Sequence, residues 1–158
     1  MTVTRTLALA LATTAALAVL APAAQAATAA DSAATAWGPY YAPAHAAKAA
    51  GTLKATGEDH ADLPTADVVH ISGTVRDYTR APATCGWAVF RITYRSGNNL
   101  PFKHHSIRDC SYRTPKHFSF KHRDVYQVDI KVCAAAKTTK PTLNCLYAGT
   151  WKTLYLSK

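Results

Sequence analysis

The sequence predicts an all-β fold: a small antiparallel, immunoglobulin-like β-sandwich of six or seven strands with two disulfides, preceded by an extended N-terminal arm. Three observations support this prediction. Apolar and polar residues alternate along several short segments after residue 66. Turn residues separate these segments at intervals of roughly 8 to 12 residues, which is typical of a sandwich. Four cysteines lie in the second half of the chain.

The first 26 residues have the layout of a secretory signal peptide. Arg5 provides a positive n-region, an apolar run extends from Leu7 to Leu20, and Ala24-Gln25-Ala26 forms an A-x-A cleavage site. The apolar run is shorter than the roughly 20 residues that a membrane span needs. We therefore expect residues 1–26 to be removed and the product to be secreted and extracellular, without a membrane span.

Residues 27–50 are predicted to form a flexible, Ala-rich arm, because they have almost no charge and too few large apolar residues for an amphipathic helix. The arm carries an aromatic island in which two prolines favour an extended backbone. Its aromatic side chains either fold back on their own domain or anchor the arm in the groove of a partner. The candidate partner-binding residues are Trp37, Gly38, Pro39, Tyr40 and Tyr41.

The folded domain is predicted over residues 51–158, and its clearest strand is 86–95. Successive side chains of a strand point to opposite faces. One face is therefore expected to be buried, and the other, which includes Arg91, is expected to face water. The predicted buried face consists of Ala88, Phe90, Ile92 and Tyr94.

The same alternation predicts six further strands, some of them weak. The segment 100–107 is expected to be an edge strand, because it follows a proline. No pattern predicts a long helix after residue 60. The further strands are predicted at 51–57, 67–76, 100–107, 116–122, 125–133 and 146–156.

The four cysteines, Cys85, Cys110, Cys133 and Cys145, are expected to form disulfides in an exported protein. Four cysteines allow three connectivities, and the sequence alone does not choose among them. We favour Cys85–Cys110 and Cys133–Cys145, because each pair closes a loop between neighbouring predicted strands. No C-x-x-C pair or H-x₃₋₅-H set accompanies the cysteines, so we expect no metal site and no cofactor.

The chain is strongly basic, with 18 Lys and Arg against 9 Asp and Glu. Such a charge favours acidic partners, or it serves solubility alone. A basic patch between Phe102 and Arg123 could bind an anionic envelope polymer, although a merely solvated face is the alternative. No nucleic-acid-binding signature is present, so nucleic acid is not expected as a partner. The predicted patch consists of Lys103, Arg108, Arg113, Lys116, Lys121 and Arg123.

No catalytic constellation is visible, so the protein is expected to be noncatalytic. The only glutamate, Glu58, lies in a predicted turn, whereas glycoside hydrolysis usually needs two carboxyl groups. No G-x-S-x-G motif occurs. The adjacent pair His104 and His105 would point to opposite faces of a strand and would not chelate one ion.

Four short motifs follow the signal peptide in order: Trp37-Gly38-Pro39, Gly51-Thr52-Leu53-Lys54-Ala55-Thr56-Gly57, Ser72-Gly73-Thr74-Val75 and Cys85-Gly86-Trp87. This layout resembles the small adaptor subunit of umbrella toxin particles, which are secreted actinobacterial antibacterial assemblies. The resemblance implies a noncatalytic adaptor that links a large repeat-containing toxin subunit to trypsin-like, lectin-bearing subunits. It also implies that the N-terminal segment docks in a cleft of the trypsin-like partner. A cationic module for anionic cell-envelope polymer and a protease inhibitor are the alternatives.

Overall fold

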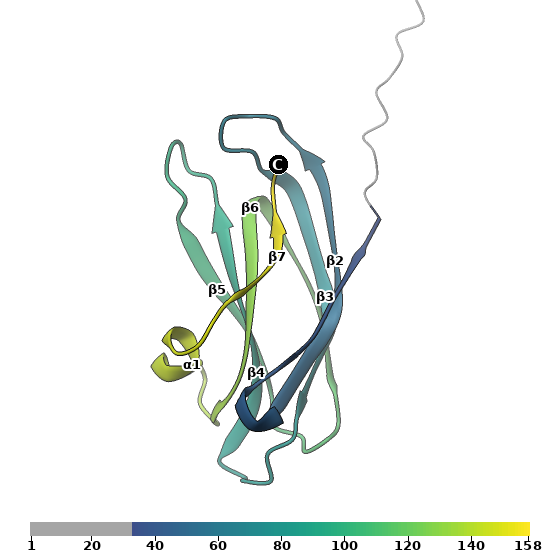
Figure 1. The fold of residues 1–158 in the computed structure, drawn as a ribbon, viewed down its shortest axis with the longest axis vertical. Coiled ribbons are helices and arrows are strands. Elements are labelled where there is room, and N and C mark those ends of the chain that lie inside the picture. The colour runs from purple at the N-terminus through teal and green to yellow at the C-terminus, as the bar shows by residue number, and fades with distance from the viewer. Residues whose placement is uncertain (1–32) are drawn as a thin grey trace, which may run out of the picture.

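The computed structural model describes residues 33–158, so the predicted signal peptide and residues 27–32 lie outside the described part. Seven strands, a 3₁₀ turn at Pro43–His45 and the short helix α1 (Leu143–Tyr147) make up this part (Figure 1). Neither helical segment is long and apolar enough to cross a membrane. The predicted all-β antiparallel class with two disulfides is confirmed. The strands are β1 (Thr35–Tyr41), β2 (Ala47–Glu58), β3 (Ala66–Asp77), β4 (Thr84–Tyr94), β5 (Phe102–Asp109), β6 (Lys116–Ala136) and β7 (Lys152–Leu156).

Strand β6 joins the two layers of the fold. All strands belong to one antiparallel sheet in the order β1-β2-β3-β6-β4-β5, with β7 also paired to β6. Residues 116–125 of β6 pair with β3, whereas residues 125–136 pair with β4. Asp124, which separates these halves, has a positive φ of 54°. The sequence predicted two strands here, at 116–122 and 125–133, but the chain continues through the bend as one strand.

The core lies between the two layers. Ala88, Phe90 and Ile92 are completely buried and Tyr94 is partly buried, so the predicted inner face of β4 is confirmed. The ring of Phe90 lies 5.6 Å from Phe118 on the other layer, measured between ring centroids, with the rings edge to face. Burial of each large apolar side chain contributes about 1.5–3 kcal/mol.

The sequence predicted that the outer face of β4 would face water, and this prediction is wrong for the first half of the strand. Trp87 and Val89 are fully buried there, in a second apolar cluster with Cys133 and Cys145. Leu146 and Trp151, from the segment after β6, pack against this cluster. The predicted strand at 146–156 therefore begins only at residue 152, because the chain first forms α1 beside the second cluster.

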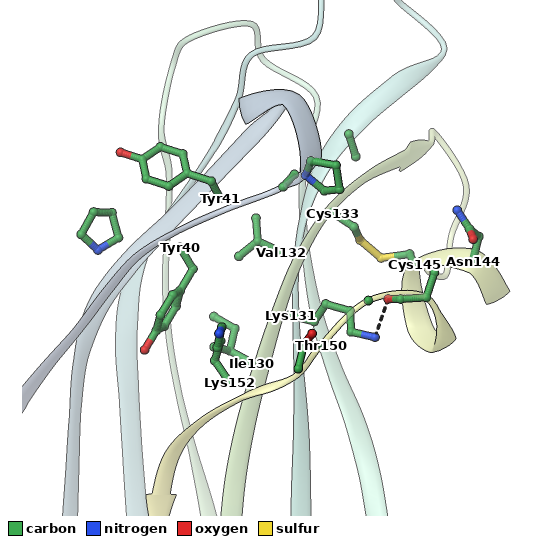
Figure 2. A pocket seen from close by; sticks show the side chains of 16 residues that line it. Tyr40, Tyr41, Ile130, Lys131, Val132, Cys133, Asn144, Cys145, Thr150 and Lys152 are labelled. Atoms are coloured by element: carbon green, nitrogen blue, oxygen red, sulfur yellow. Dashed lines mark hydrogen bonds between the residues drawn. A yellow bond between two sulfur atoms is a disulfide. The ribbon is translucent and has the colours of Figure 1, made fainter.

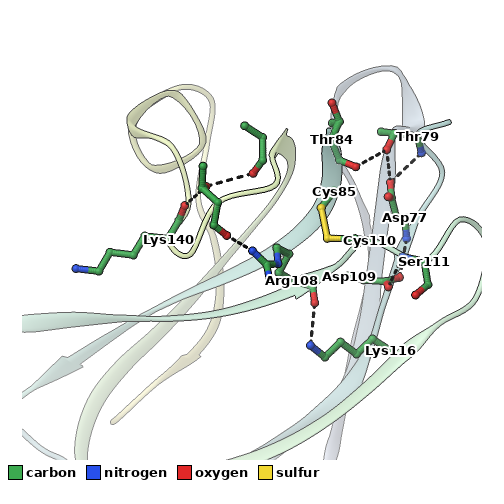
Figure 3. The surroundings of a disulfide bond; sticks show 12 residues. Asp77, Thr79, Thr84, Cys85, Arg108, Asp109, Cys110, Ser111, Lys116 and Lys140 are labelled. Atoms are coloured by element: carbon green, nitrogen blue, oxygen red, sulfur yellow. Dashed lines mark hydrogen bonds between the residues drawn. A yellow bond between two sulfur atoms is a disulfide. The ribbon is translucent and has the colours of Figure 1, made fainter. Parts of the chain in front are cut away.

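Both favoured disulfide pairings are confirmed. Cys85–Cys110 joins β4 to the end of β5, and Cys133–Cys145 joins β6 to α1. Beside the first disulfide lie two buried carboxylates, those of Asp77 and Asp109 (Figure 3). Asp109 accepts a hydrogen bond of 3.0 Å from the backbone N–H of Asp77. Both carboxylates also accept from backbone N–H groups two residues further on, so they stabilise turns.

The prediction of a flexible arm over 27–50 is wrong from residue 35 onward, and so is the predicted domain start at residue 51. Residues 35–41 form β1, which pairs with β2. Trp37 is only 6% exposed, and its indole packs against the core. A Cβ atom on Gly51 would lie 2.7 Å from Cζ2 of Trp37, and one on Gly73 would lie 3.0 Å from the same atom. The indole thus occupies a niche that only these paired glycines leave open.

Candidate binding groove

A groove of about 680 Å³ opens on the side of the sandwich where β1 faces the second half of β6 (Figure 2). Its volume lies within the usual range of ligand pockets. One wall comes from β1 and the turn after it, the floor from β6, and the other wall from the segment between α1 and β7. The lining includes Pro39, Tyr40, Tyr41, Pro43, Ile130, Lys131, Val132, Ala134, Asn144, Thr150 and Lys152.

The floor of the groove is an unpaired strand edge. Strand β7 pairs with β6 only as far as Ile130, which lies opposite Lys152. Strand β6 continues to Ala136 and remains paired with β4 on its other side. Within residues 33–158, no strand covers the β7 side of residues 131–136. In an antiparallel strand, every second residue directs its N–H and C=O toward such an open edge, which can accept another strand.

The β1 wall is lined by Tyr40 and Tyr41. Tyr41 pairs with Lys48, which faces outward, so of these two rings only that of Tyr40 projects from the inner side of the strand. A register shift between Trp37 and Tyr40 places both residues on the inner side of β1, where their rings stack with centroids 6.4 Å apart. Gly38 allows this shift, because its φ is +80°, a backbone conformation that favours glycine. Tyr41 remains 45% exposed, and the ammonium of Lys48 lies 5.8 Å from its ring.

Lys131 fixes the opposite wall. Its side chain is almost fully buried, and Nζ donates hydrogen bonds of 2.9 and 2.8 Å to the carbonyl oxygens of Leu146 and Ala148. The ammonium also lies 4.6 Å from the Trp151 ring. Burial lowers the pKa of Lys131, and the nearby Arg91 guanidinium lowers it further. Together with the disulfide Cys133–Cys145, these contacts hold the wall in place beside the open strand edge.

The groove is chemically suited to binding. Its lining contains tyrosine rings, prolines, small apolar side chains and lysine ammonium groups, and no carboxylate or imidazole. Among residues 33–158, no group of three or more His, Cys, Asp or Glu side chains is placed to hold a metal ion. This surface can offer a ligand backbone hydrogen bonds and aromatic contacts.

The structure divides the predicted aromatic site. Pro39, Tyr40 and Tyr41 line the groove, whereas Trp37 lies in the core. The sequence left two alternatives open for the aromatic side chains, docking on their own domain or on a partner. Trp37 docks on its own domain. Whether a partner uses the tyrosines stays a prediction.

The predicted basic patch is spread over two faces. Arg108 lies on β5, where its guanidinium donates a hydrogen bond to the carbonyl oxygen of Thr138 (Figure 3). Lys116 donates to the carbonyl oxygen of Arg108 at 3.0 Å. Lys121 projects from the first half of β6, on the outer face of the other layer. The remaining members also occupy separate places: Lys103 near Tyr94, Arg113 over Tyr112, and Arg123 beside Val68.

Sequence reasoning missed the β6 side of the groove. The strand predicted at 125–133 stops three residues before β6 ends at Ala136. No local pattern shows that the pairing of β7 with β6 stops at Ile130. The aromatic island was the only available signal, and its pairing with β2 determines where the tyrosines lie.

Comparisons of the chain with protein-family models, curated proteins and solved structures gave no match.

Proposed function

We propose that this protein is a secreted, noncatalytic protein–protein interaction module, which binds an extended segment of another secreted protein in the groove beside β1. The observation that carries the proposal is the open edge of β6 after Ile130, which lies beside a wall that includes the Tyr40 ring. An extended segment would add a strand to this edge, and its side chains would contact the ring of Tyr40. Six residues of strand span about 20 Å, enough for several backbone hydrogen bonds.

The adaptor role fits this mode of binding. An adaptor must hold at least two other components, and a rigid sandwich closed by two disulfides offers separate surfaces for them. In the layout that the sequence resembles, the module would link a trypsin-like, lectin-bearing subunit to a large repeat-containing toxin subunit of an extracellular antibacterial assembly. The signal-peptide pattern and the two disulfides support secretion.

The test is selection of displayed random peptides on the mature protein, followed by two groove variants. Tyr40→Ser removes the ring on the groove side of β1, and Thr150→Trp fills the groove from the opposite side. Thr150 is exposed and Tyr40 is only partly buried, so both variants should stay folded, which urea unfolding checks. We expect each variant to weaken peptide binding at least tenfold. Hydrogen exchange should show new protection of the amides in residues 131–136 when the peptide is bound.

Matched controls are Tyr147→Ser and Thr139→Trp, which alter exposed residues of the same types outside the groove. They should bind peptide as the unaltered protein does. Equal losses in controls and groove variants, or peptide binding without protection of residues 131–136, would show that the groove is not the binding site. Deletion of residues 27–50 is unsuitable as a test, because it removes β1 and part of β2.

A further inference from the structure

The outer face of the layer β1-β2-β3-β6 carries a second feature, which goes beyond the proposed function. Residues directly opposite one another in an antiparallel pair project from the same face. Val69, Ile71 and Val75 of β3 are buried in the core, so the residues between them, and their partners on β2 and β6, face outward. The cationic and imidazole side chains on this outer face are Lys48, His70, Arg76, His117, Lys121 and Arg123.

Glu58, at the end of β2, is the only acidic residue in register with the outward positions of β2, β3 and the first half of β6, and its carboxylate accepts a hydrogen bond from the Tyr155 hydroxyl. Within residues 33–158 the recorded ion pairs are Arg91–Asp129 and Arg95–Asp59, and neither involves this face. The other acidic residues of these segments lie at their ends: Asp67 and Asp124 at the same end as Glu58, and the buried Asp77 at the opposite end. The positive charge of the face is therefore not neutralised by neighbouring carboxylates. Lys54 also faces outward, but it interacts with another group of the protein.

Hydroxyl groups fill the middle of the face. Thr52 and Ser72 share a hydrogen bond of 3.0 Å between their side-chain oxygens, and Ser119 Oγ lies 2.7 Å from His70 Nε2. Arg76 lies toward one end of these polar side chains and Lys121 toward the other. Outward rows follow one another every two residues, or about 6.7 Å along the strands. Donors thus recur at regular steps along the strands.

The composition of this face indicates which kind of anion it fits. Single-stranded nucleic acids usually stack their bases on exposed aromatic rings, and Tyr41 at the edge is the only tyrosine, phenylalanine or tryptophan at an outward position in the register of this layer. Protein interfaces are usually centred on apolar or aromatic anchors, whereas the outward apolar side chains of β2 and β3 are only Ala50 and Val68. A linear polymer with regularly repeated charges and no rings needs neither. Phosphodiester groups accept hydrogen bonds from hydroxyl, ammonium and guanidinium donors alike.

We propose that the outer face of β2, β3 and the first half of β6 binds a linear phosphodiester polymer, such as the alditol phosphate chains of a cell envelope. The charged rows lie along the polymer backbone, and the central hydroxyl groups donate to its phosphate oxygens. This site is separate from the groove, so a partner segment and the polymer can be bound at the same time.

The test measures binding of the mature protein to immobilised poly(glycerol phosphate). The variant Arg76→Thr/Lys121→Thr removes two charges from the face, and threonine is well accepted in strands. The matched control, Lys137→Thr/Lys140→Thr, removes two charges from an exposed loop. We expect the face variant to bind at least tenfold more weakly and the control to bind within twofold of the unaltered protein. Raising NaCl from 50 to 300 mM should also weaken binding about tenfold or more, because exposed charges are screened.

Several results would overturn the proposal. Equal losses in the two variants would mean that only net charge matters. Equal binding to poly(glycerol phosphate) and to polyglutamate would show that phosphodiesters are not selected, and binding to anionic vesicles but not to the free polymer would assign the face to membranes. Thermal unfolding of each variant shows whether a loss reflects misfolding. Peptide binding by the same variants stays unchanged if the groove is separate, so failure here does not affect the groove proposal.

Discussion

Trp37→Ala tests whether β1 is part of the folded domain. The tryptophan is only 6% exposed, and burial of such a side chain removes roughly 200 Å² from water. At about 25 cal/mol per Å² this contributes about 5 kcal/mol, and compactness of the unfolded chain reduces the figure to about 4 kcal/mol. The indole Nε1 is buried without a hydrogen-bond partner, which costs about 1 kcal/mol that alanine avoids. We therefore expect the free energy of unfolding to fall by about 3 kcal/mol.

Urea unfolding followed by circular dichroism measures this change. With a typical slope of about 1.5 kcal/mol per molar urea, the midpoint should fall by roughly 2 M. Tyr41→Ala is the matched control, because this ring is 45% exposed and its loss should change the free energy of unfolding by no more than about 0.5 kcal/mol. Trp87 and Trp151 remain as fluorescent probes in both variants.

A different result would refute the structural reasoning. If Trp37→Ala leaves the midpoint within about 0.3 M of the original value, the indole does not contribute to the core. Loss of partner binding at unchanged stability would then restore the flexible-arm interpretation that the sequence suggested.

Four further changes have definite expected outcomes. Gly73→Ala should lower the free energy of unfolding by about 2 kcal/mol or more in the same urea assay, because the new Cβ meets the core indole and the neighbouring strand. An unchanged midpoint would show that the indole niche does not require glycine at this position. Asp129→Ala should cost about 2–3 kcal/mol, since this buried carboxylate accepts from arginine, glutamine and threonine side chains; a loss below 1 kcal/mol would mean that those donors find other partners. Burial lowers the pKa of both His105 and His122, so the unfolded chain binds protons more readily than the folded protein. Urea midpoints should therefore be constant above about pH 6.5 and fall as the pH drops below it. Reduction of both disulfides should lower the melting temperature by many degrees, because the chain-entropy model gives roughly 3 kcal/mol for each loop; scanning calorimetry with and without reductant would show no shift if the cysteines do not stabilise the fold.

Much of the sheet could be predicted from local patterns. The alternation along 86–95 identified the inner face of β4, and the cysteine positions suggested the correct pairing. The outer face of the same strand could not be predicted, because the cover over Trp87 and Val89 comes from a segment about 60 residues later. Alternation shows which residues share a face, and it does not show what lies against each face.

The candidate groove was only partly within reach of sequence reasoning. The aromatic island was identified, but its tryptophan and its tyrosines were treated as one unit. The register shift in β1 separates Trp37, which enters the core, from Tyr41, which remains at the surface. Two glycines far apart in the sequence, Gly51 and Gly73, complete the niche for the indole.

By itself the sequence determined the class of fold, the inner faces of its main strands and an excess of basic residues, because these follow from residue types and a period of two along each strand. Only the tertiary structure decided that β1 closes the sandwich, that β7 leaves the end of β6 open, and that the cations divide between two faces. The physical reason is that strand pairing is non-local. Which edge stays open depends on where distant strands end, and no short stretch of the chain contains that information.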